Sequence, residues 1–482
     1  MELKKYKLGE ILDVTRGASL SGEFYATEGE YIRLTCGNFD YQNNCFKENK
    51  SKDNLYYTGD FRSEFLMGKG DIITPLTEQA IGLLGSAAII PEGGKYIQSQ
   101  DVAKIICKED LLDKDFAFYL ISSTLVKQQL SATAQQTKIR HTSPDKIKDC
   151  TVWIPELAEQ KRISKLLRSL DCKIELNRVI NQNLEAMAKQ LYDYWFVQFD
   201  FPNEEGKPYK SSGGAMVWNE ELKREIPQGW SNMSIGDYAP CKSGYAFKSK
   251  DFGDKGLSVI KIGNIQENYT LDMTDSQCID LFNKTLFLAK RYDLVIAMTG
   301  ATIGKFAISQ SNYWVNQRVG RFYLGDRPLL RLGFLFNSLK QEYFREQVFQ
   351  IACGCAQPNI SAEQIDSISI LKPNDVILNQ FNKLCEPLLE LQSENYLQIE
   401  ELTKQRDDLL PLLMNGGGIS DGGGHGQLNV PQAQIAQRHR ADIQQGNRQI
   451  GPDHGPADLR AADENLVSGV KTHDHAYGDD HF

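Results

Sequence analysis

The stretch LAEQKRISKLLRSLDCKIELNRVINQNLEAMAKQLYDYWFVQF, residues 157–199, contains neither proline nor glycine and is amphipathic along its length. Its apolar residues recur at alternating spacings of four and three, the heptad pattern of a helix that packs along another helix. A helix of about forty residues is roughly 60 Å long and needs a partner to cover its apolar seam. One seam position is occupied by Ile163, Leu170, Asn177, Leu184 and Leu191, and the other by Leu167, Ile174, Asn181, Ala188 and Trp195.

A second stretch, residues 378–414, supplies the partner. Its seam has the same spacing, and each position lies 218 residues after one in the first stretch, including the central asparagine. A polar residue in an apolar seam fixes the register of two helices at a cost in stability. We therefore predict an antiparallel helix pair in which Asn177 and Asn395 meet and form a hydrogen bond. The second seam consists of Phe381, Leu388, Asn395, Leu402 and Leu409.

The same offset continues upstream of both helices, which indicates an internal repeat. Pro155 precedes Pro373 by 218 residues; the offset is 222 between 70–73 and 292–295, and 227 between 8–10 and 235–237. Insertions and deletions between two copies produce such a drift. The period is far longer than that of solenoid repeats, so two domain-sized copies are implied. Each copy is predicted to be a globular domain followed by one long helix.

The expected fold class is α+β, with two tandem domains separated by two long antiparallel coiled-coil helices in a pseudo-two-fold internal repeat. Short β-rich runs alternate with Gly- and Asn-rich turns in the first domain, where one helix is expected over 115–130 and an exposed loop over 132–141. The predicted segments are a first domain 1–155, a helix 156–200, a linker 201–226 rich in Pro, Gly and Ser, a second domain 227–374, a helix 375–415, and a low-complexity, disordered tail 416–482.

Length and composition agree with this organisation. The chain has 482 residues, of which 41% are hydrophobic, enough for two domain cores. No run approaches the about 20 apolar residues of a membrane span, and the N-terminus lacks the apolar core of a signal peptide, so we expect a cytoplasmic protein without membrane contact. The ten cysteines include no CxxC pair, and we predict no metal site; a metal-binding role for the tail, which holds six of the seven histidines, is the alternative.

The net charge of −9 comes from the C-terminal part of the chain. Residues 375–415 carry 3 basic and 8 acidic residues and the tail 5 and 9, whereas 1–155 carry 19 and 21, and 227–374 carry 16 and 13. Neither domain is strongly basic, so this chain alone is not expected to bind DNA non-specifically with high affinity. Phosphate contacts would come from local clusters of cations or from partner subunits.

No catalytic motif stands out. His141 is the only histidine outside the tail, which leaves at most one candidate base for a nucleophilic triad. The run TGATIGK at 299–305 departs from a phosphate-binding loop, because its first glycine is one residue too close to Gly304-Lys305 and Phe306 stands where Ser or Thr would hold magnesium. A glycine-rich hairpin is the better interpretation. A duplicated protein without a catalytic motif suggests a recognition protein or a scaffold, and not a free-standing nuclease or methyltransferase.

Several motifs resemble those of the specificity subunit of type I restriction-modification systems. In the first copy they are Ile154-Pro155, EQKRI at 159–163, LD at 170–171, KIELN at 173–177, INQ at 180–182 and YWFV at 194–197. In the second copy they are DLV at 293–295, MTGATIGK at 298–305, NQRV at 316–319 and QPNIS at 357–361. The resemblance covers about residues 1–415, and the tail departs from the family pattern.

This resemblance implies a non-catalytic subunit whose two target-recognition domains each read one half of a split, asymmetric double-stranded DNA site across an unread spacer. It implies that two methyltransferase subunits dock on the helix pair and that two motor-nuclease subunits join the complex. The complex would methylate adenine with S-adenosylmethionine and cut DNA with ATP and Mg, while this chain itself holds no cofactor. The alternative is an assembly scaffold without sequence readout.

Candidate DNA contacts are polar and cationic residues on the expected loops, because Arg and Lys suit guanine edges whereas Asn and Gln suit adenine. The QPN run at 357–359 could equally shape a turn or touch phosphate. We expect Lys138→Ala and Arg140→Ala to weaken DNA binding by the assembled methylase. The candidates in the first domain are Thr15, Arg16, Gln135, Gln136, Lys138 and Arg140, and those in the second are Lys242, Tyr245, Lys248, Gln317, Arg318, Gln357 and Asn359.

Overall fold

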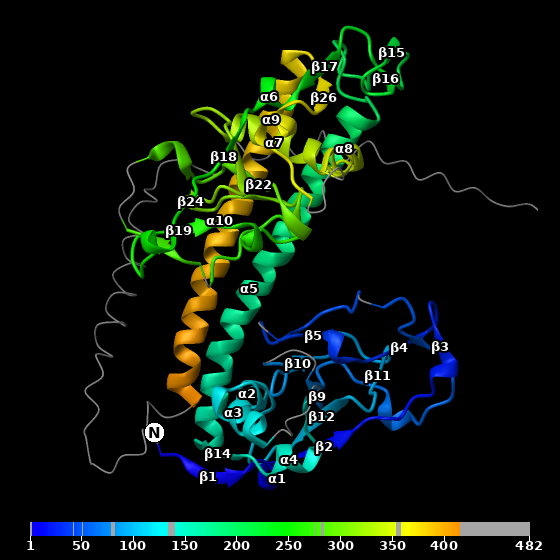
Figure 1. Ribbon diagram of the computed structural model, residues 1–482. Coiled ribbons are helices and arrows are strands. Elements are labelled where there is room, and N and C mark those ends of the chain that lie inside the picture. Colours follow the sequence, from blue (N-terminus) through cyan, green and yellow to red (C-terminus); the bar gives the residue numbers. More distant parts are fainter. Residues whose placement is uncertain are drawn as a thin grey trace, which may run out of the picture. The chain divides into compact units, whose positions relative to one another are not determined.

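The computed structural model describes residues 2–41, 43–50, 52–78, 82–133, 140–274, 276–280, 284–352 and 358–414, all within one compact unit (Figure 1). Four candidate DNA contacts and the tail at 416–482 lie outside these residues; the four are Gln135, Gln136, Lys138 and Gln357. Across the described ranges, no helix is long and apolar enough to cross a membrane.

The first domain is built on two four-stranded sheets. Its strands are β1 (Lys4–Lys7), β2 (Leu12–Arg16), β3 (Tyr25–Ala26), β4 (Tyr31–Arg33), β5 (Phe39–Asp40), β6 (Cys45–Phe46), β7 (Tyr56–Tyr57), β8 (Ile72–Pro75), β9 (Thr77–Glu78), β10 (Ala88–Ile89), β11 (Tyr96–Ile97), β12 (Val102–Cys107), β13 (Arg140–His141) and β14 (Thr151–Ile154). The antiparallel sheet has the order β10-β8-β12-β2. The other has the order β11-β4-β7-β3, in which β11 and β4 are parallel. The remaining strands form the pairs β1–β14, β5–β6 and β13–β9.

Four helices belong to this domain: α1 (Leu8–Ile11), α2 (Lys114–Ile121), α3 (Thr124–Thr133) and α4 (Pro144–Lys148). The single helix expected over 115–130 is wrong, because the chain breaks between α2 and α3. At the break, the Ser122 hydroxyl donates to the carbonyl of Phe118 and the Ser123 hydroxyl to that of Leu120. Serine side chains that bond to nearby backbone groups compete with the helical hydrogen bonds, which explains the break.

The second domain repeats this arrangement. Its strands are β17 (Ser231–Ser234), β18 (Cys241–Ser243), β19 (Leu257–Ile260), β20 (Cys278–Ile279), β21 (Leu288–Ala289), β22 (Leu294–Ala297), β23 (Phe306–Ile308), β24 (Tyr313–Val315), β25 (Val319–Phe322) and β26 (Ser369–Lys372), and its helices are α6 (Ile235–Tyr238), α7 (Leu329–Leu339), α8 (Glu342–Ala352) and α9 (Ala362–Asp366). Its four-stranded sheets have the orders β18-β25-β22-β23 and β20-β19-β24-β21. The pair β22–β23 is the hairpin predicted around the glycine-rich run at 299–305.

Equivalent elements of the two domains are separated by the offsets seen in the sequence. The starts of α4 and α9, and of β14 and β26, are 218 residues apart; those of β8 and β22 are 222 apart, and those of β1 and β17 are 227 apart. The sheet order β2-β12-β8-β10 of the first domain corresponds to β18-β25-β22-β23 of the second. The predicted α+β fold with an internal repeat is therefore confirmed.

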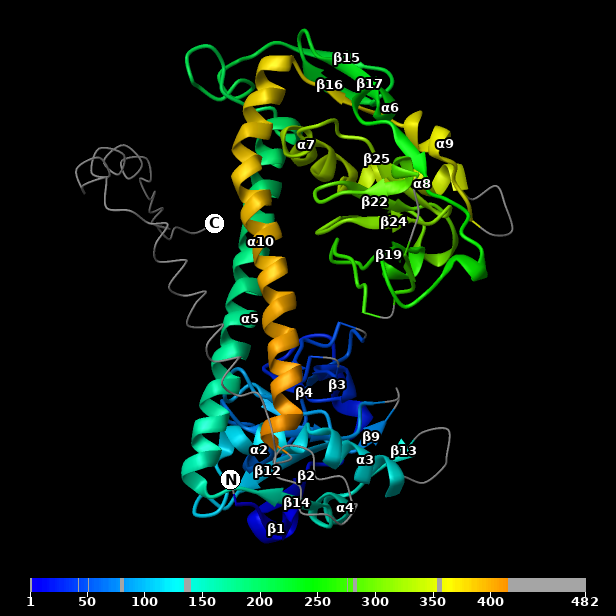
Figure 2. The same cartoon turned by 90° about the vertical axis from the view of Figure 1, so that its left-hand side faces the viewer.

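Each domain is followed by one long helix, α5 (Leu157–Tyr192) or α10 (Asp375–Met414), and the two helices run side by side and antiparallel (Figure 2). A π-helical turn, Asp193–Val197, continues α5. In the predicted seam, Ile163, Leu170, Leu184 and Phe381 are buried, Leu191 and Leu388 pack partly buried against the core of the second domain, and Leu402 and Leu409 are half-buried.

The predicted hydrogen bond between Asn177 and Asn395 is wrong. The Asn395 amide donates instead to the side-chain oxygen of Asn181 at 2.9 Å, and Asn177 donates to Gln398 at 3.1 Å. Asn181 lies four residues, about one helical turn, beyond Asn177. Both asparagines of α5 occupy seam positions, so the heptad pattern is satisfied by either register, and tertiary contacts decide between them.

The segment expected to be a linker folds onto the second domain. It contains a hairpin of β15 (Met216–Asn219) and β16 (Arg224–Pro227). Phe201 stacks on Trp230 with ring centroids 4.6 Å apart, and both rings belong to the apolar core of that domain. The aromatic residues of this segment therefore attach the end of α5 to the second domain.

Candidate nucleic-acid interface

In the first domain, three neighbouring strands bring their loops to one edge of the antiparallel sheet. Arg16 at the end of β2 pairs with Ala103, and Pro75 at the end of β8 pairs with Val102, so both strands end where β12 begins. The pair β9–β13 lies just beyond the end of β8. We call this the loop edge of the first domain: Arg16, residues 99–101, Thr77–Glu78 and Arg140–His141.

The second domain has an equivalent loop edge: Ser243, residues 316–318, Thr299 and Asn359. Ser243 pairs with Gly320 and Ala297 with Val319, which places the ends of β18 and β22 beside the start of β25. Thr299 forms a bridge with Asn359, at the positions that correspond to Thr77 and His141 of the first domain. Segments that are distant in the sequence therefore meet at the same place in both domains.

A glycine at each loop edge allows two chain segments to touch. A Cβ atom on Gly17 would lie 2.2 Å from the carbonyl oxygen of Gln98, and one on Gly244 would lie 2.2 Å from that of Val315. The residues that follow the two glycines form the bridges Ala18–Ser99 and Tyr245–Asn316. Because the obstructing atoms belong to the backbone, only glycine fits at these two positions.

The described candidates of the first domain are held by the protein itself. Thr15 is half-buried in β2, and its carbonyl accepts from the Gln98 amide at 2.8 Å. Arg16 is exposed, but its Nε donates to the carbonyl of Gln100 at 2.8 Å. Arg140 donates to the Glu78 carboxylate at 3.5 Å and to the Ser131 hydroxyl at 3.1 Å. The guanidinium groups of this edge thus have internal partners.

Most candidates of the second domain are exposed to solvent. Lys242, Gln317, Arg318 and Asn359 are exposed, and among the described residues neither cation of this set forms an ion pair within 4 Å. Tyr245 is half-buried between Phe247 and Phe287, and the Lys284 ammonium lies 4.7 Å from its ring centroid. Lys248 is exposed further along the same loop, where its backbone N–H donates to Asp251. This edge presents cations, amides and an aromatic ring together.

Two charged residues that contact the candidate DNA-binding residues escaped the sequence-based prediction. The Glu78 side chain is only 6% exposed and accepts from the backbone of Gly82 and Leu84 as well as from Arg140. Lys284 reaches Tyr245 from a loop distant in the sequence. The only signal for Glu78 was its place just after a buried strand, and nothing in the sequence marked Lys284.

An ion pair occurs at equivalent positions in both domains. Lys104 bonds to Asp71 at 2.6 Å, and Arg321 lies 3.4 Å from Asp293 at the corresponding positions. Each aspartate also accepts a backbone N–H three residues earlier in the chain. Burial raises the pKa of Asp293. Each pair links the residue just before one strand, β8 or β22, to the neighbouring strand, β12 or β25. Among the described residues, no group of three His, Cys, Asp or Glu could hold a metal ion.

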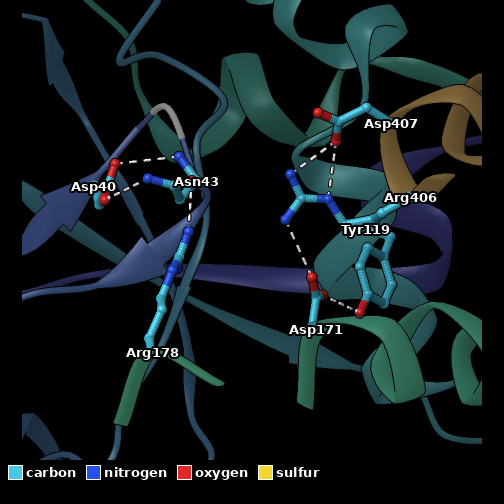
Figure 3. A network of polar contacts seen from close by, with 7 residues as sticks. All are labelled: Asp40, Asn43, Tyr119, Asp171, Arg178, Arg406 and Asp407. Atoms are coloured by element: carbon cyan, nitrogen blue, oxygen red, sulfur yellow. Dashed lines mark hydrogen bonds and ion pairs between the residues drawn. The ribbon is translucent and has the colours of Figure 1, made fainter. Parts of the chain in front are cut away.

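Among the polar contacts between the first domain and α5 are two shown in Figure 3, and one of them continues through Asp171 to α10. In one, the Asp171 carboxylate of α5 accepts from the Tyr119 hydroxyl of α2 at 2.5 Å and from Arg406 of α10 at 3.1 Å. In the other, Arg178 of α5 donates to the side-chain oxygen of Asn43 at 3.0 Å. Asn43 in turn donates to Asp40 through its backbone N–H and its side-chain amide.

The fold and these edges define a class of protein: two equivalent domains that present loops for binding, carried by an antiparallel helix pair. The family model of the type I restriction modification DNA specificity domain matches the chain twice, at residues 1–186 and 227–401. The chain belongs to this family. Its function is DNA sequence recognition in a type I restriction-modification system, and it is a specificity component and not an enzyme.

Individual relatives agree with this assignment. The chain is similar to the specificity subunit of the type I restriction enzyme MjaIX from Methanocaldococcus jannaschii, with 23% identity over 322 residues, 66% of this chain and 72% of that protein. It is 27% identical over 335 residues to the MjaVIII specificity subunit of the same organism, covering 67% and 75%. Among solved structures, the type I S subunit from M. genitalium has the same fold, with a TM-score of 0.57, 16% identity and coverage of 86% and 96%.

Proposed function

We propose that the chain reads a split, asymmetric DNA site, with one half-site contacted by each loop edge. The observation that carries this proposal is that the two loop edges, together with the residues adjoining them in the chain, have the same backbone arrangement but present different side chains. Lys242 stands where the first domain has Thr15, Tyr245 where it has Ala18, and Asn359 where it has His141. Because hydrogen-bonding side chains distinguish base pairs in the major groove, different edges select different half-sites.

The helix pair then sets the unread spacer. Helix α5 has 36 residues and is about 54 Å long at about 1.5 Å per residue. At roughly 3.4 Å per base pair this length corresponds to about 16 base pairs. Both domains pack along part of the helix, so the unread gap is shorter than this.

Two methyltransferase subunits dock on the helix pair in our proposal, one at each end. Apolar side chains that remain exposed on the helices occur at positions related by the repeat: Leu166 is 45% exposed and Leu384 50%, while Tyr194 is 38% exposed and Leu412 56%. Exposed apolar residues at repeat-related positions suit two copies of one partner, because pseudo-symmetry offers each copy the same contacts.

The remaining partners follow from the same assignment. Two motor-nuclease subunits would complete the complex, which would act in the cytoplasm on double-stranded DNA. S-adenosylmethionine would serve the methyltransferase subunits, and ATP and Mg the motor-nuclease subunits. This chain would supply sequence selection without binding a cofactor.

The experiment that tests the proposal maps adenine methylation across the genome of a methylation-free host. The partner methylase is expressed with this chain, without it, and with a version that ends at Asn415. A split, asymmetric motif that appears only with the chain is the expected result. An assembled complex that methylates no defined motif, with either length of the chain, would overturn the proposal in favour of an assembly scaffold.

A further inference from the structure

The two domains are joined to the helix pair in different ways. The second domain is covalently continuous with both helices, because α5 runs into it through the segment before β17 and α10 leaves it after β26. The first domain is continuous with α5 alone. Its junction with the end of α10 depends on non-covalent contact, so the position of this domain against α10 is not fixed by the chain.

Apolar packing provides part of that junction. Met414 is 3% exposed and lies in the core of the first domain with Ile163 and Leu167, and Leu410 and Leu413 pack against the same core. Such contacts are strong but non-directional, and they tolerate a shift to a neighbouring turn. The heptad seam has the same tolerance, as the two seam asparagines of α5 illustrate.

The contact of Tyr119, Asp171 and Arg406 is directional and joins three elements at one point. Arg406 is 8% exposed, and its guanidinium also pairs with Asp407 at 2.8 Å. Burial and the Asp171 carboxylate raise the pKa of the Tyr119 phenol, so it remains protonated and donates. A shift of α10 by one turn would separate the buried Arg406 guanidinium from the partly exposed Asp171 carboxylate, which is costly for the buried charge.

A second directional contact lies along the same face of α5. Arg178 is seven residues after Asp171, which places both side chains on one side of the helix. Its partner Asn43 belongs to the β5–β6 hairpin, a different layer of the domain from α2. Two contacts separated along the helix fix the rotation of the first domain as well as its position.

The repeat-related positions at the other end lack these groups. Asp171 corresponds to Leu389, Arg406 to Ala188 and Arg178 to Tyr396. Leu389 and Ala188 are both buried in the apolar core of the second domain. Within the described ranges, that domain has other polar contacts with the helices: the ion pair Lys340–Glu185 at 2.6 Å with α5, and a hydrogen bond from Ser393 of α10 to Gln310 at 2.7 Å.

We propose that Tyr119, Asp171 and Arg406, with Arg178 and Asn43 in support, are positioning residues that determine the number of unread base pairs between the half-sites. This inference rests on the proposed reading of a split site. Displacing the first domain by one helical turn moves its loop edge by about 5.4 Å, between one and two base pairs. Each base pair also rotates the groove by roughly 35°, so a loosely held domain would reach neighbouring spacings.

The test uses the full complex with the variant Tyr119→Phe, Asp171→Leu and Arg406→Ala. These changes remove the three bonded groups together and leave only Asp407, whose side chain is 56% exposed, without its partner. Two of them introduce the residue found at the repeat-related position. Replacing a buried ion pair by apolar residues is often neutral for stability. The variant Arg178→Ala, at a partly exposed side chain, tests the second contact without altering the buried set.

Methylation is mapped for sites whose half-sites are separated by the normal spacing and by one base pair fewer or more. We expect the triple variant to keep both half-site sequences and to raise methylation at the neighbouring spacings by about tenfold or more. Arg178→Ala should act in the same direction with a smaller effect. The matched control, Lys340→Ala with Glu185→Ala, removes a comparable contact of the second domain and should keep the normal spacing.

Two results would overturn the proposal. One is strict spacing in an assembled complex of the triple variant and of Arg178→Ala. The other is relaxed spacing in the Lys340 and Glu185 control to the same extent, which would mean that any weakened domain contact suffices. Failure of the unaltered chain to direct a split motif would contradict the proposed function instead, so the two failures are distinguishable.

Discussion

In the first domain, the arginines of the loop edge bond to the protein itself, Arg16 to a backbone carbonyl and Arg140 to Glu78. In the second domain, Lys242 and Arg318 are exposed and form no ion pair within the described residues. The counts of charged residues show the same difference between the domains: residues 1–155 have 19 basic and 21 acidic residues, whereas 227–374 have 16 and 13. The two loop edges therefore have the same backbone arrangement but differ in their exposed charge. The second domain should contribute more of the attraction to DNA phosphates.

The largest effect is expected from substitutions of the glycine that allows two backbone segments to touch at each loop edge. Gly17→Ala and Gly244→Ala each place a Cβ against a backbone carbonyl, which cannot rotate away, so the two bridged segments must separate. We expect each substitution to abolish methylation of the split site by the assembled methylase. Gly263→Ala is the control, because nothing lies within 4 Å of its Cβ. Normal methylation with Gly17→Ala or Gly244→Ala would mean that the loop edges do not read DNA.

The next largest effect is expected at the exposed cations of the second domain. If Arg318 contacts a guanine, Arg318→Ala should weaken binding of the assembled methylase by about 1–3 kcal/mol and relax one position of the second half-site. Fluorescence anisotropy at several salt concentrations measures the affinity. Arg327→Ala is the matched control, since this exposed arginine lies by the start of α7, away from the loop edge. A uniform loss with a salt slope lower by about one would assign Arg318 to a phosphate instead.

Arg140→Ala should have a smaller effect on DNA binding than Arg318→Ala. The substitution leaves the buried Glu78 carboxylate without its cation, so we expect the free energy of unfolding to fall by about 1–3 kcal/mol. Urea denaturation of the complex measures this loss, and Glu78→Gln added to Arg140→Ala should recover part of it. A loss of DNA affinity equal to that of Arg318→Ala, with unchanged stability, would restore Arg140 as a direct contact.

The sequence predicted the elements of the fold that are periodic or repeated. The heptads of both helices and the offsets of 218, 222 and 227 are visible in one chain because hydrophobic spacing reports local geometry directly. The break after Ile121 was missed because serine side chains, and not a proline or glycine, end that helix.

The candidate site was less predictable because its residues are brought together by tertiary structure. Glu78 and Arg140 are 62 residues apart, and Asp171 and Arg406 are 235 apart. No spacing rule connects such positions, so a cation that is bound internally looks the same in the sequence as one that is free for DNA. The glycines at the loop edges were also missed, because a close approach of two backbones leaves no periodic pattern.

The smallest effect is expected from substitutions that distinguish the two possible registers of the helix pair. Asn181 is 3% exposed and Asn395 5%, and they bond to each other, whereas Asn177 is half-buried and bonds to Gln398. Asn395→Leu alone should lower the free energy of unfolding by about 1–3 kcal/mol, because it leaves Asn181 without its donor. Adding Asn181→Leu should reverse most of this loss, since the seam is then apolar at both positions.

A double-mutant cycle measured by urea denaturation gives the coupling energy for each pair. We expect a clear coupling between Asn181 and Asn395 and almost none between Asn177 and Asn395, because only contacting residues deviate from additivity. Coupling between Asn177 and Asn395 alone would restore the register predicted from the heptads. The positions of Arg406 against Asp171 and of Asn395 against Asn181 belong to one register, so the same cycle also tests the register that the bond between Arg406 and Asp171 requires.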